Sequence, residues 1–88
     1  MQTIGRLLLV EDEANIAKAL IINLEKSGYH VEWQTRGDTA LTALKNSVYD
    51  LVILDIMLPG IDGLEVLRSF RTAGGLTPVL MLTAKGDV

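Results

Sequence analysis

The sequence of 88 residues contains no cysteine, which excludes disulfide bonds, thiolate chemistry and zinc sites built on cysteine. No apolar run approaches the roughly 18 residues that a membrane-spanning helix needs. The first residues also lack the basic segment, long apolar segment and cleavage site of a secretory signal. We therefore expect a cytoplasmic protein that makes no contact with a membrane.

Basic residues are few, and they form no cluster. The chain has 8 lysines and arginines against 11 acidic residues, which gives a net charge of −3. Without a basic patch to neutralise a phosphate backbone, direct contact with nucleic acid is not expected. Hydrophobic residues make up 49% of the chain, which favours a single domain over residues 1–88 with apolar elements buried on more than one side.

The apolar pattern predicts four strands, over residues 6–10, 29–34, 51–54 and 78–83. The first and third runs are uninterrupted, which is typical of strands that are covered on both faces. Residues 29–34 alternate between apolar and polar side chains and therefore predict a half-buried, peripheral strand. In this strand we expect Trp33 in the core and His30 at the surface.

Three helices are predicted between these strands. The first runs from residue 13 to about residue 27, and Gly28 ends it. Its apolar face is expected to comprise Ile16, Ala17, Leu20, Ile21 and Leu24. The second is expected to be capped by Asp38 and to carry Leu41, Leu44 and Val48, and the third to be capped by Asp62 and to carry Val66, Leu67 and Phe70. Strands that alternate with helices predict a parallel sheet with helices on both faces.

Polar residues collect where the predicted strands end. Glu11 and Asp12 follow the first strand, Asp55 ends the third and Thr83 ends the fourth. Taken singly, the acids could cap a helix or begin a turn, and Thr83 could be an ordinary strand residue. Ligands of such sheets bind beyond the carboxyl ends of the strands, so we expect these side chains to converge. A converged set of carboxylates repels itself unless a cation joins it, and oxygen ligands suit Mg²⁺ or Mn²⁺.

Asp55 is the best placed nucleophile, because a buried strand fixes its position. A carboxylate of this kind can attack phosphorus and form an acyl phosphate. The loop after Asp55 can offer a backbone carbonyl to the metal. The Thr83 hydroxyl and a backbone N–H near Ala84 can donate hydrogen bonds to the oxygens of the transferred group.

Three segments resemble the response-regulator receiver family: residues 8–13 (LLVEDE), 54–63 (LDIMLPGIDG) and 82–84 (LTA). The Glu-Asp order and the Met-Leu-Pro loop are most similar to the winged-helix transcription-factor branch of that family. The resemblance implies a flavodoxin-like (CheY-like) three-layer α/β/α fold with a parallel sheet in the strand order 2-1-3-4. It implies the receiver module of a two-component system, which takes part in its own phosphorylation and is not a turnover enzyme.

The resemblance also implies a role for each site residue. Asp55 is the phosphoacceptor for a sensor histidine kinase. Asp12, Asp55 and the Met57 carbonyl ligate Mg²⁺, and Glu11 assists through water. Thr83 is the switch hydroxyl, with Ala84 beside it.

A complete receiver domain continues with a fourth helix, a fifth strand that bears a phosphate-binding lysine, and a fifth helix. We therefore expect a receiver domain truncated after its fourth strand, and Lys85 is not assigned the role of that lysine. The alternative is a phosphorylation-incompetent fragment that self-associates through an unprotected edge strand. An aspartyl-phosphate hydrolase usually has a second aspartate where Met57 stands. A flavin-binding protein of this topology needs a hydroxyl- or glycine-rich phosphate loop in place of the acids after the first strand.

Overall fold

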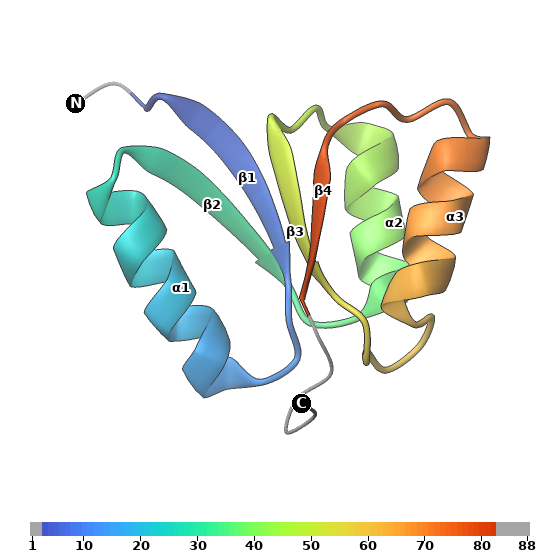
Figure 1. Ribbon diagram of the computed structural model, residues 1–88, viewed down its shortest axis with the longest axis horizontal. Helices are drawn as coiled ribbons and strands as arrows, with labels where there is room; N and C mark the ends of the chain where they lie inside the picture. Colours follow the sequence, from blue (N-terminus) through green and yellow to red (C-terminus); the bar gives the residue numbers. More distant parts are fainter. Residues whose placement is uncertain (1–2, 83–88) are drawn as a thin grey trace.

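The computed structural model describes residues 3–82, in which strands and helices alternate (Figure 1). The elements are β1 (Gly5–Val10), α1 (Ala14–Lys26), β2 (Tyr29–Gln34), α2 (Gly37–Asn46), β3 (Leu51–Asp55), α3 (Gly63–Thr72) and β4 (Val79–Leu82). Each predicted strand and helix therefore has a counterpart among the described residues, and Thr83, the predicted end of the fourth strand, lies outside them. None of the helices in residues 3–82 has the length and apolar character needed to cross a bilayer.

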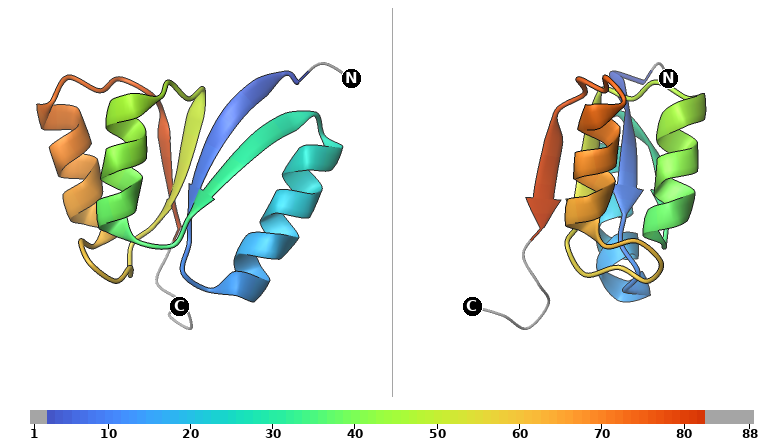
Figure 2. Two further views of the ribbon diagram at one scale, coloured as in Figure 1. Left: turned by 180° about the vertical axis from the view of Figure 1, so that it is seen from behind. Right: turned by 90° about the vertical axis from the view of Figure 1, so that its right-hand side faces the viewer.

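The four strands form one parallel sheet in the order β2-β1-β3-β4. Helix α1 covers one face of this sheet, and α2 and α3 lie side by side on the other (Figures 1 and 2). The predicted three-layer, flavodoxin-like arrangement and its strand order are confirmed. The two inner strands, β1 and β3, carry most of the buried residues, which explains why their sequences are apolar without interruption.

Each face of the sheet has its own hydrophobic cluster. On the side of α2 and α3, the buried members are Leu8, Val10, Ala40, Tyr49, Val52, Leu54 and Val66. On the side of α1 they are Leu9, Ala17 and Ile53, with partly buried neighbours that include Trp33. Trp33 is thus half-buried in the core, and His30 is exposed, as predicted.

Three expectations about the helices are wrong in detail. Asp38 does not cap α2: the helix already begins at Gly37, after Arg36, so Asp38 lies in its first turn and its carboxylate accepts hydrogen bonds from Arg36 instead. Val48 is 81% exposed. Ser47, the residue before it, has an extended backbone, so Val48 no longer follows the helical spacing that would place it on the apolar face of α2. Ile16 is 38% exposed. It belongs to the apolar pattern of α1 but not to the residues of this helix that pack in the cluster on the sheet.

A polar network joins β1, β2 and the segment before β3, away from the carboxyl edge of the sheet. The Tyr49 hydroxyl donates a hydrogen bond of 2.7 Å to Glu32, which also forms an ion pair with Arg6. The Arg6 guanidinium lies 5.3 Å from the centroid of the Tyr49 ring. These two donors, Tyr49 first, hold the pKa of Glu32 below its ordinary value of 4.5.

We predict that Tyr49→Phe lowers the free energy of unfolding by about 1 kcal/mol at neutral pH, because a hydrogen bond to a charged but partly exposed carboxylate is lost. The folded-state pKa of Glu32 is depressed, so this stabilisation is present above pH 4.5 and is lost as the pH falls through the folded-state pKa. Urea unfolding followed by Trp33 fluorescence, at neutral pH and at a pH low enough to protonate Glu32 in the folded chain, measures the change. Tyr29→Phe, outside this network, is the control. An equal deficit at both pH values would contradict the assignment.

Candidate metal centre

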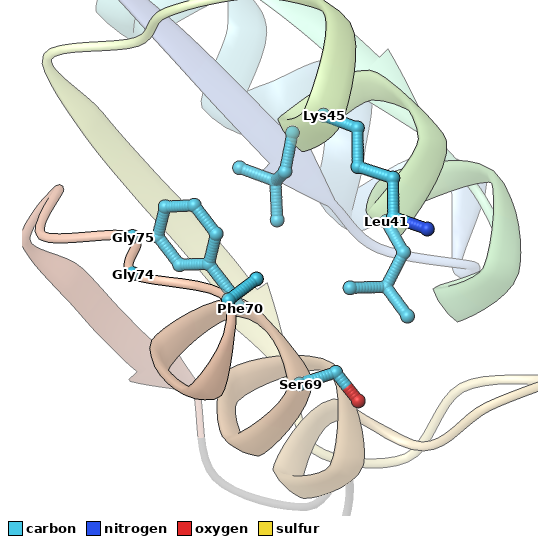
Figure 3. A pocket seen from close by; sticks show the side chains of 8 residues that line it. Leu41, Lys45, Ser69, Phe70, Gly74 and Gly75 are labelled. Carbon is cyan, nitrogen blue, oxygen red and sulfur yellow. The ribbon is translucent and has the colours of Figure 1, made fainter.

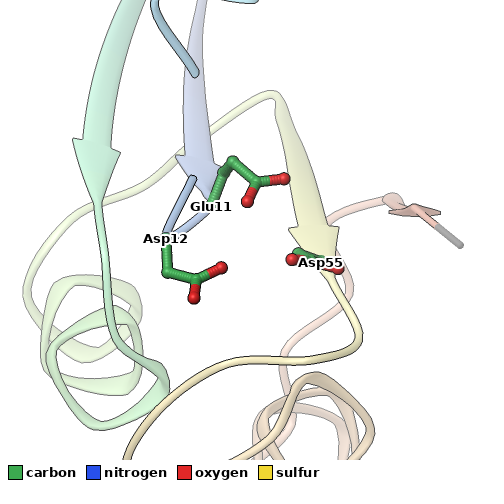
Figure 4. A group of neighbouring side chains, drawn as sticks. All are labelled: Glu11, Asp12 and Asp55. Atoms are coloured by element: carbon green, nitrogen blue, oxygen red, sulfur yellow. The ribbon is translucent and has the colours of Figure 1, made fainter. Parts of the chain in front are cut away.

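Three carboxylates meet at the carboxyl edge of the sheet (Figure 4). β1 pairs with β3 so that Val10 is opposite Leu54, and the next residues, Glu11 and Asp55, therefore lie level with each other. Asp12 follows in the loop after β1. One carboxylate oxygen from each of these three acids lies within 4.8 Å of the others. The predicted convergence is therefore found for the three acids.

The rest of the predicted phosphate site lies outside the described residues. Thr83 and Ala84 follow Leu82, the last residue of β4 and of the described chain, and Lys85 comes just after them. Their contribution stays a prediction. Within the sheet, Leu82 pairs with Asp55, so β4 ends beside the acid that ends β3.

The three acids differ in their exposure to solvent. Glu11 and Asp55 are buried, at 1% and 0% exposure, whereas Asp12 is exposed. A backbone N–H two residues further along the chain holds each buried carboxylate. Glu13 donates to Glu11 at 2.8 Å, and Met57 donates to Asp55 at 3.3 Å. The cluster thus consists of two buried carboxylates that are held by backbone donors and one carboxylate that is exposed to solvent.

Trp33 connects the edge strand to this cluster. Its indole Nε1 donates a hydrogen bond of 2.8 Å to the backbone carbonyl of Glu11. The sequence predicted only a core position for Trp33, and nothing in the local pattern pointed to this bond. The fluorescence of Trp33 should therefore respond to changes at the acids.

The donor set fits a small divalent cation. In octahedral Mg²⁺ coordination, metal–oxygen distances of about 2.1 Å place adjacent ligand oxygens about 3.0 Å apart and opposite ones about 4.2 Å apart. One oxygen of each carboxylate lies within 4.8 Å of the others, which is near enough for one ion to be held directly or through its bound water. Bringing these negative groups together is unfavourable by charge repulsion, which a cation relieves.

A hollow of about 460 Å³ connects the cluster with the loop after β3. Asp12 borders this hollow together with Ile56, Met57, Leu58 and Asp62. The backbone of Met57 thus belongs to a loop that shares the hollow with one of the three acids. Its role as a carbonyl ligand remains a prediction.

A larger groove, of about 610 Å³, runs between α2 and α3 (Figure 3). Leu41, Leu44 and Lys45 of α2 and Phe70 and Ala73 of α3 are among the residues that line it. None of the three converging acids borders this groove. Of the three acids, Asp12 borders the smaller hollow.

Gly63 makes a close contact that the sequence does not predict. Asp62, the residue before it, is predicted to cap α3 and does accept a hydrogen bond of 2.9 Å from the backbone N–H of Glu65. In addition, a Cβ on Gly63 would lie 2.1 Å from the carbonyl oxygen of Asp55. The Gly63 N–H donates to the Ile56 carbonyl at 2.8 Å. The start of α3 therefore packs directly on the end of β3.

The comparisons with known proteins agree on one family. The model of the response regulator receiver domain matches residues 7–88. The transcriptional regulatory protein DltR of Streptococcus agalactiae is 50% identical over 82 residues, which cover 93% of this chain and 37% of DltR. The uncharacterized transcriptional regulatory protein YkoG of Bacillus subtilis is 46% identical over 84 residues, covering 96% of this chain and 37% of YkoG. The chain thus spans little more than a third of these relatives, and both are transcriptional regulators, as the predicted branch implies.

Solved structures agree with this result. The receiver domain of Francisella response regulator 1452 superposes with a TM-score of 0.89 at 27% identity, covering 96% of this chain and 69% of that one. Response regulator TrrA of Thermotoga maritima, in complex with Mg²⁺-BeF, gives a TM-score of 0.85 at 40% identity, with 98% and 72% covered. The fold and the family therefore agree with the interpretation of the sequence.

We predict that Gly63→Ala destabilises the fold by about 1–3 kcal/mol, because the new methyl group meets backbone atoms that cannot move independently. Without this contact, the same change in the first turn of a helix would be neutral or stabilising. Urea unfolding measures the difference. Leu64→Ala, at a neighbouring residue that is 50% exposed, is the control. A Gly63→Ala variant as stable as the original chain would contradict the close approach.

Proposed function

Because the chain belongs to the response regulator receiver domain family, we propose that it accepts a phosphoryl group from a sensor histidine kinase on Asp55, in a Mg²⁺-dependent reaction. The observation that carries this proposal is the convergence of Glu11, Asp12 and Asp55 within 4.8 Å. The setting is a cytoplasmic two-component system. Residues 1–88 act as one receiver unit, and the control of transcription belongs to the longer protein that the relatives represent.

The proposed reaction is a transfer between two protein side chains. A carboxylate oxygen of Asp55 attacks the phosphorus of the kinase phosphohistidine, a P–O bond forms, and the P–N bond breaks. The phosphohistidine carries a proton on its other ring nitrogen, so the imidazole leaves in its neutral form, and Asp55 becomes an acyl phosphate. Because Asp55 itself is modified, the chain is a phosphoacceptor and not a turnover enzyme.

The described residues supply the orientation that such a transfer requires. Burial in β3 and the Met57 N–H hold the Asp55 carboxylate in one direction. Glu11, Asp12, Asp55 and the Met57 carbonyl are the proposed holders of the cation. When bound, Mg²⁺ (or Mn²⁺) neutralises charge on the phosphoryl oxygens. The Thr83 hydroxyl and the Ala84 N–H are the proposed hydrogen-bond donors to those oxygens.

The exposure of Asp12 supports access of a kinase to the site. Asp55 itself is fully buried, whereas Asp12 is exposed and borders the hollow beside the loop after β3. The same arrangement favours a chemical role for this edge over a purely structural one, because a merely structural edge has no need of two buried acids.

We predict that the chain gains one phosphoryl group from acetyl phosphate in the presence of Mg²⁺, as measured by intact-protein mass. Asp55→Asn abolishes the gain because the nucleophile is removed. Asp12→Asn slows it by about 10–100-fold because a metal ligand is weakened. Chelation of Mg²⁺ also stops the reaction.

Glu25→Gln is the matched control for this experiment, since Glu25 is an exposed acid on α1 that does not belong to the cluster or contact the loop after β3. It should be phosphorylated like the original chain. Modification that persists in Asp55→Asn, or that does not depend on Mg²⁺, would show that the proposed site is wrong.

We further propose that the 88-residue chain self-associates through β4. Within the described sheet, β4 pairs only with β3, and Leu80 is 54% exposed. Leu80 is opposite Ile53, a member of the cluster on the α1 side, so an apolar part of that face is open. An unpaired strand edge beside an apolar face favours pairing with a second chain.

We predict light scattering above the monomer value at tens of micromolar protein, and a return to monomer in Leu80→Glu. The control is Leu76→Glu, which places the same charge at a residue that is 88% exposed and lies before the strand. A stable monomer of the original chain at these concentrations would contradict the proposal.

A further inference from the structure

The start of α2 makes a close backbone contact with the loop that follows Asp55. The Gly37 N–H donates a hydrogen bond of 3.2 Å to the Pro59 carbonyl. A Cβ on Gly37 would lie only 1.7 Å from the Ile61 carbonyl oxygen. Gly37 is buried, and its φ is not in the left-handed region. The glycine is therefore required by the approach of the loop and not by its own backbone conformation.

The residues on either side of Gly37 contact the same loop. A Cβ on Gly60 would lie 2.8 Å from Arg36 Nη2 and 3.0 Å from Asp38 Oδ1. Arg36 and Asp38 form an ion pair of 3.0 Å with each other. Residues 36–38, which we call the α2 clamp, therefore lie against residues 59–61.

The clamped loop leads from the proposed phosphoacceptor to α3. Met57 and Leu58 of this loop border the hollow that also contains Asp12. At the far end of the loop, Gly63 packs on the carbonyl of Asp55. The loop is thus held from two sides, by α3 at Gly63 and by α2 at Gly37.

We propose that Gly37 is a positioning residue of the metal centre, which acts by holding residues 56–62 in the conformation that presents the Met57 backbone to the cation. This inference rests on the proposed function, because it assumes that the cation binds there. It goes beyond that function, since Gly37 lies on a different element and does not belong to the carboxylate cluster.

Whether Gly37→Ala stabilises or destabilises the chain distinguishes this role from ordinary helix propensity. In a helix with open space, replacing glycine by alanine is stabilising, because alanine loses less backbone freedom on folding. At Gly37 the added methyl group meets the Ile61 carbonyl, so either the loop or the helix must move. Gly37→Ala should therefore loosen the loop and weaken the metal site together.

The test measures two quantities for Gly37→Ala. Hydrogen exchange of the amides of residues 56–62, recorded without metal, should become faster. Affinity for Mg²⁺, measured by titration of Trp33 fluorescence, should fall by about tenfold or more. Val31→Ala is the control, since it removes apolar packing from the cluster on the α1 side, away from the loop. It should destabilise the chain and leave loop exchange and Mg²⁺ affinity unchanged.

The possible outcomes separate this inference from the proposed function. If the original chain binds Mg²⁺ and Gly37→Ala binds it equally well, the inference is wrong and the proposed function stands. If Val31→Ala weakens Mg²⁺ binding as much as Gly37→Ala, the effect is general destabilisation and the inference is again wrong. If the original chain binds no Mg²⁺, both fail. Should Gly37→Ala not fold, Arg36→Ala replaces it. Faster exchange at the amides of Gly60 and Ile61 is then expected, and unchanged exchange overturns the inference.

Discussion

The parallel pairing of β1 with β3 places the two buried acids side by side. Val10 is opposite Leu54, and Glu11 and Asp55 are the residues that come next in the two strands. A shift of one residue would turn one of these side chains to the other face of the sheet. Both strands are apolar on both faces, so an alternation of apolar and polar residues cannot determine which residues of the two strands pair. Arg6 and Asp50 do, since the Arg6 N–H donates to the Asp50 side chain and the Asp50 N–H donates to the Arg6 carbonyl, both at 2.8 Å.

The acid cluster is held in place by the backbone around it. Burying Glu11 and Asp55 is unfavourable on its own, because desolvation and mutual repulsion oppose it. Backbone N–H donors orient both groups, and the loop after β3 is held where α2 and α3 begin. Glycines stand at these two points of contact, Gly37 and Gly63. The buried acids thus lower the stability of the fold, and the surrounding packing compensates for this loss, as is common at functional sites.

Much of this arrangement could be predicted from the sequence, since the long apolar runs fix the strands and the acids directly follow them. What could not be predicted depends on contacts between distant segments. The start of α2 at Gly37, before Asp38, follows from how α2 meets the loop after β3. Likewise, no local pattern shows that Gly37 approaches Ile61 or that the Trp33 indole binds the Glu11 carbonyl. Turn glycines and core tryptophans have the same local signature without such roles.

The central claim is that the acid cluster at the edge of the sheet holds one divalent ion, with Asp12 and Asp55 as direct ligands and Glu11 acting through water. Crystals of the chain grown with Mn²⁺ test it most directly, because the anomalous signal locates the metal independently of the protein. The account predicts one strong peak bound to carboxylate oxygens of both Asp12 and Asp55. A map with no peak between these side chains, at Mn²⁺ concentrations that occupy other carboxylates of the surface, would contradict it.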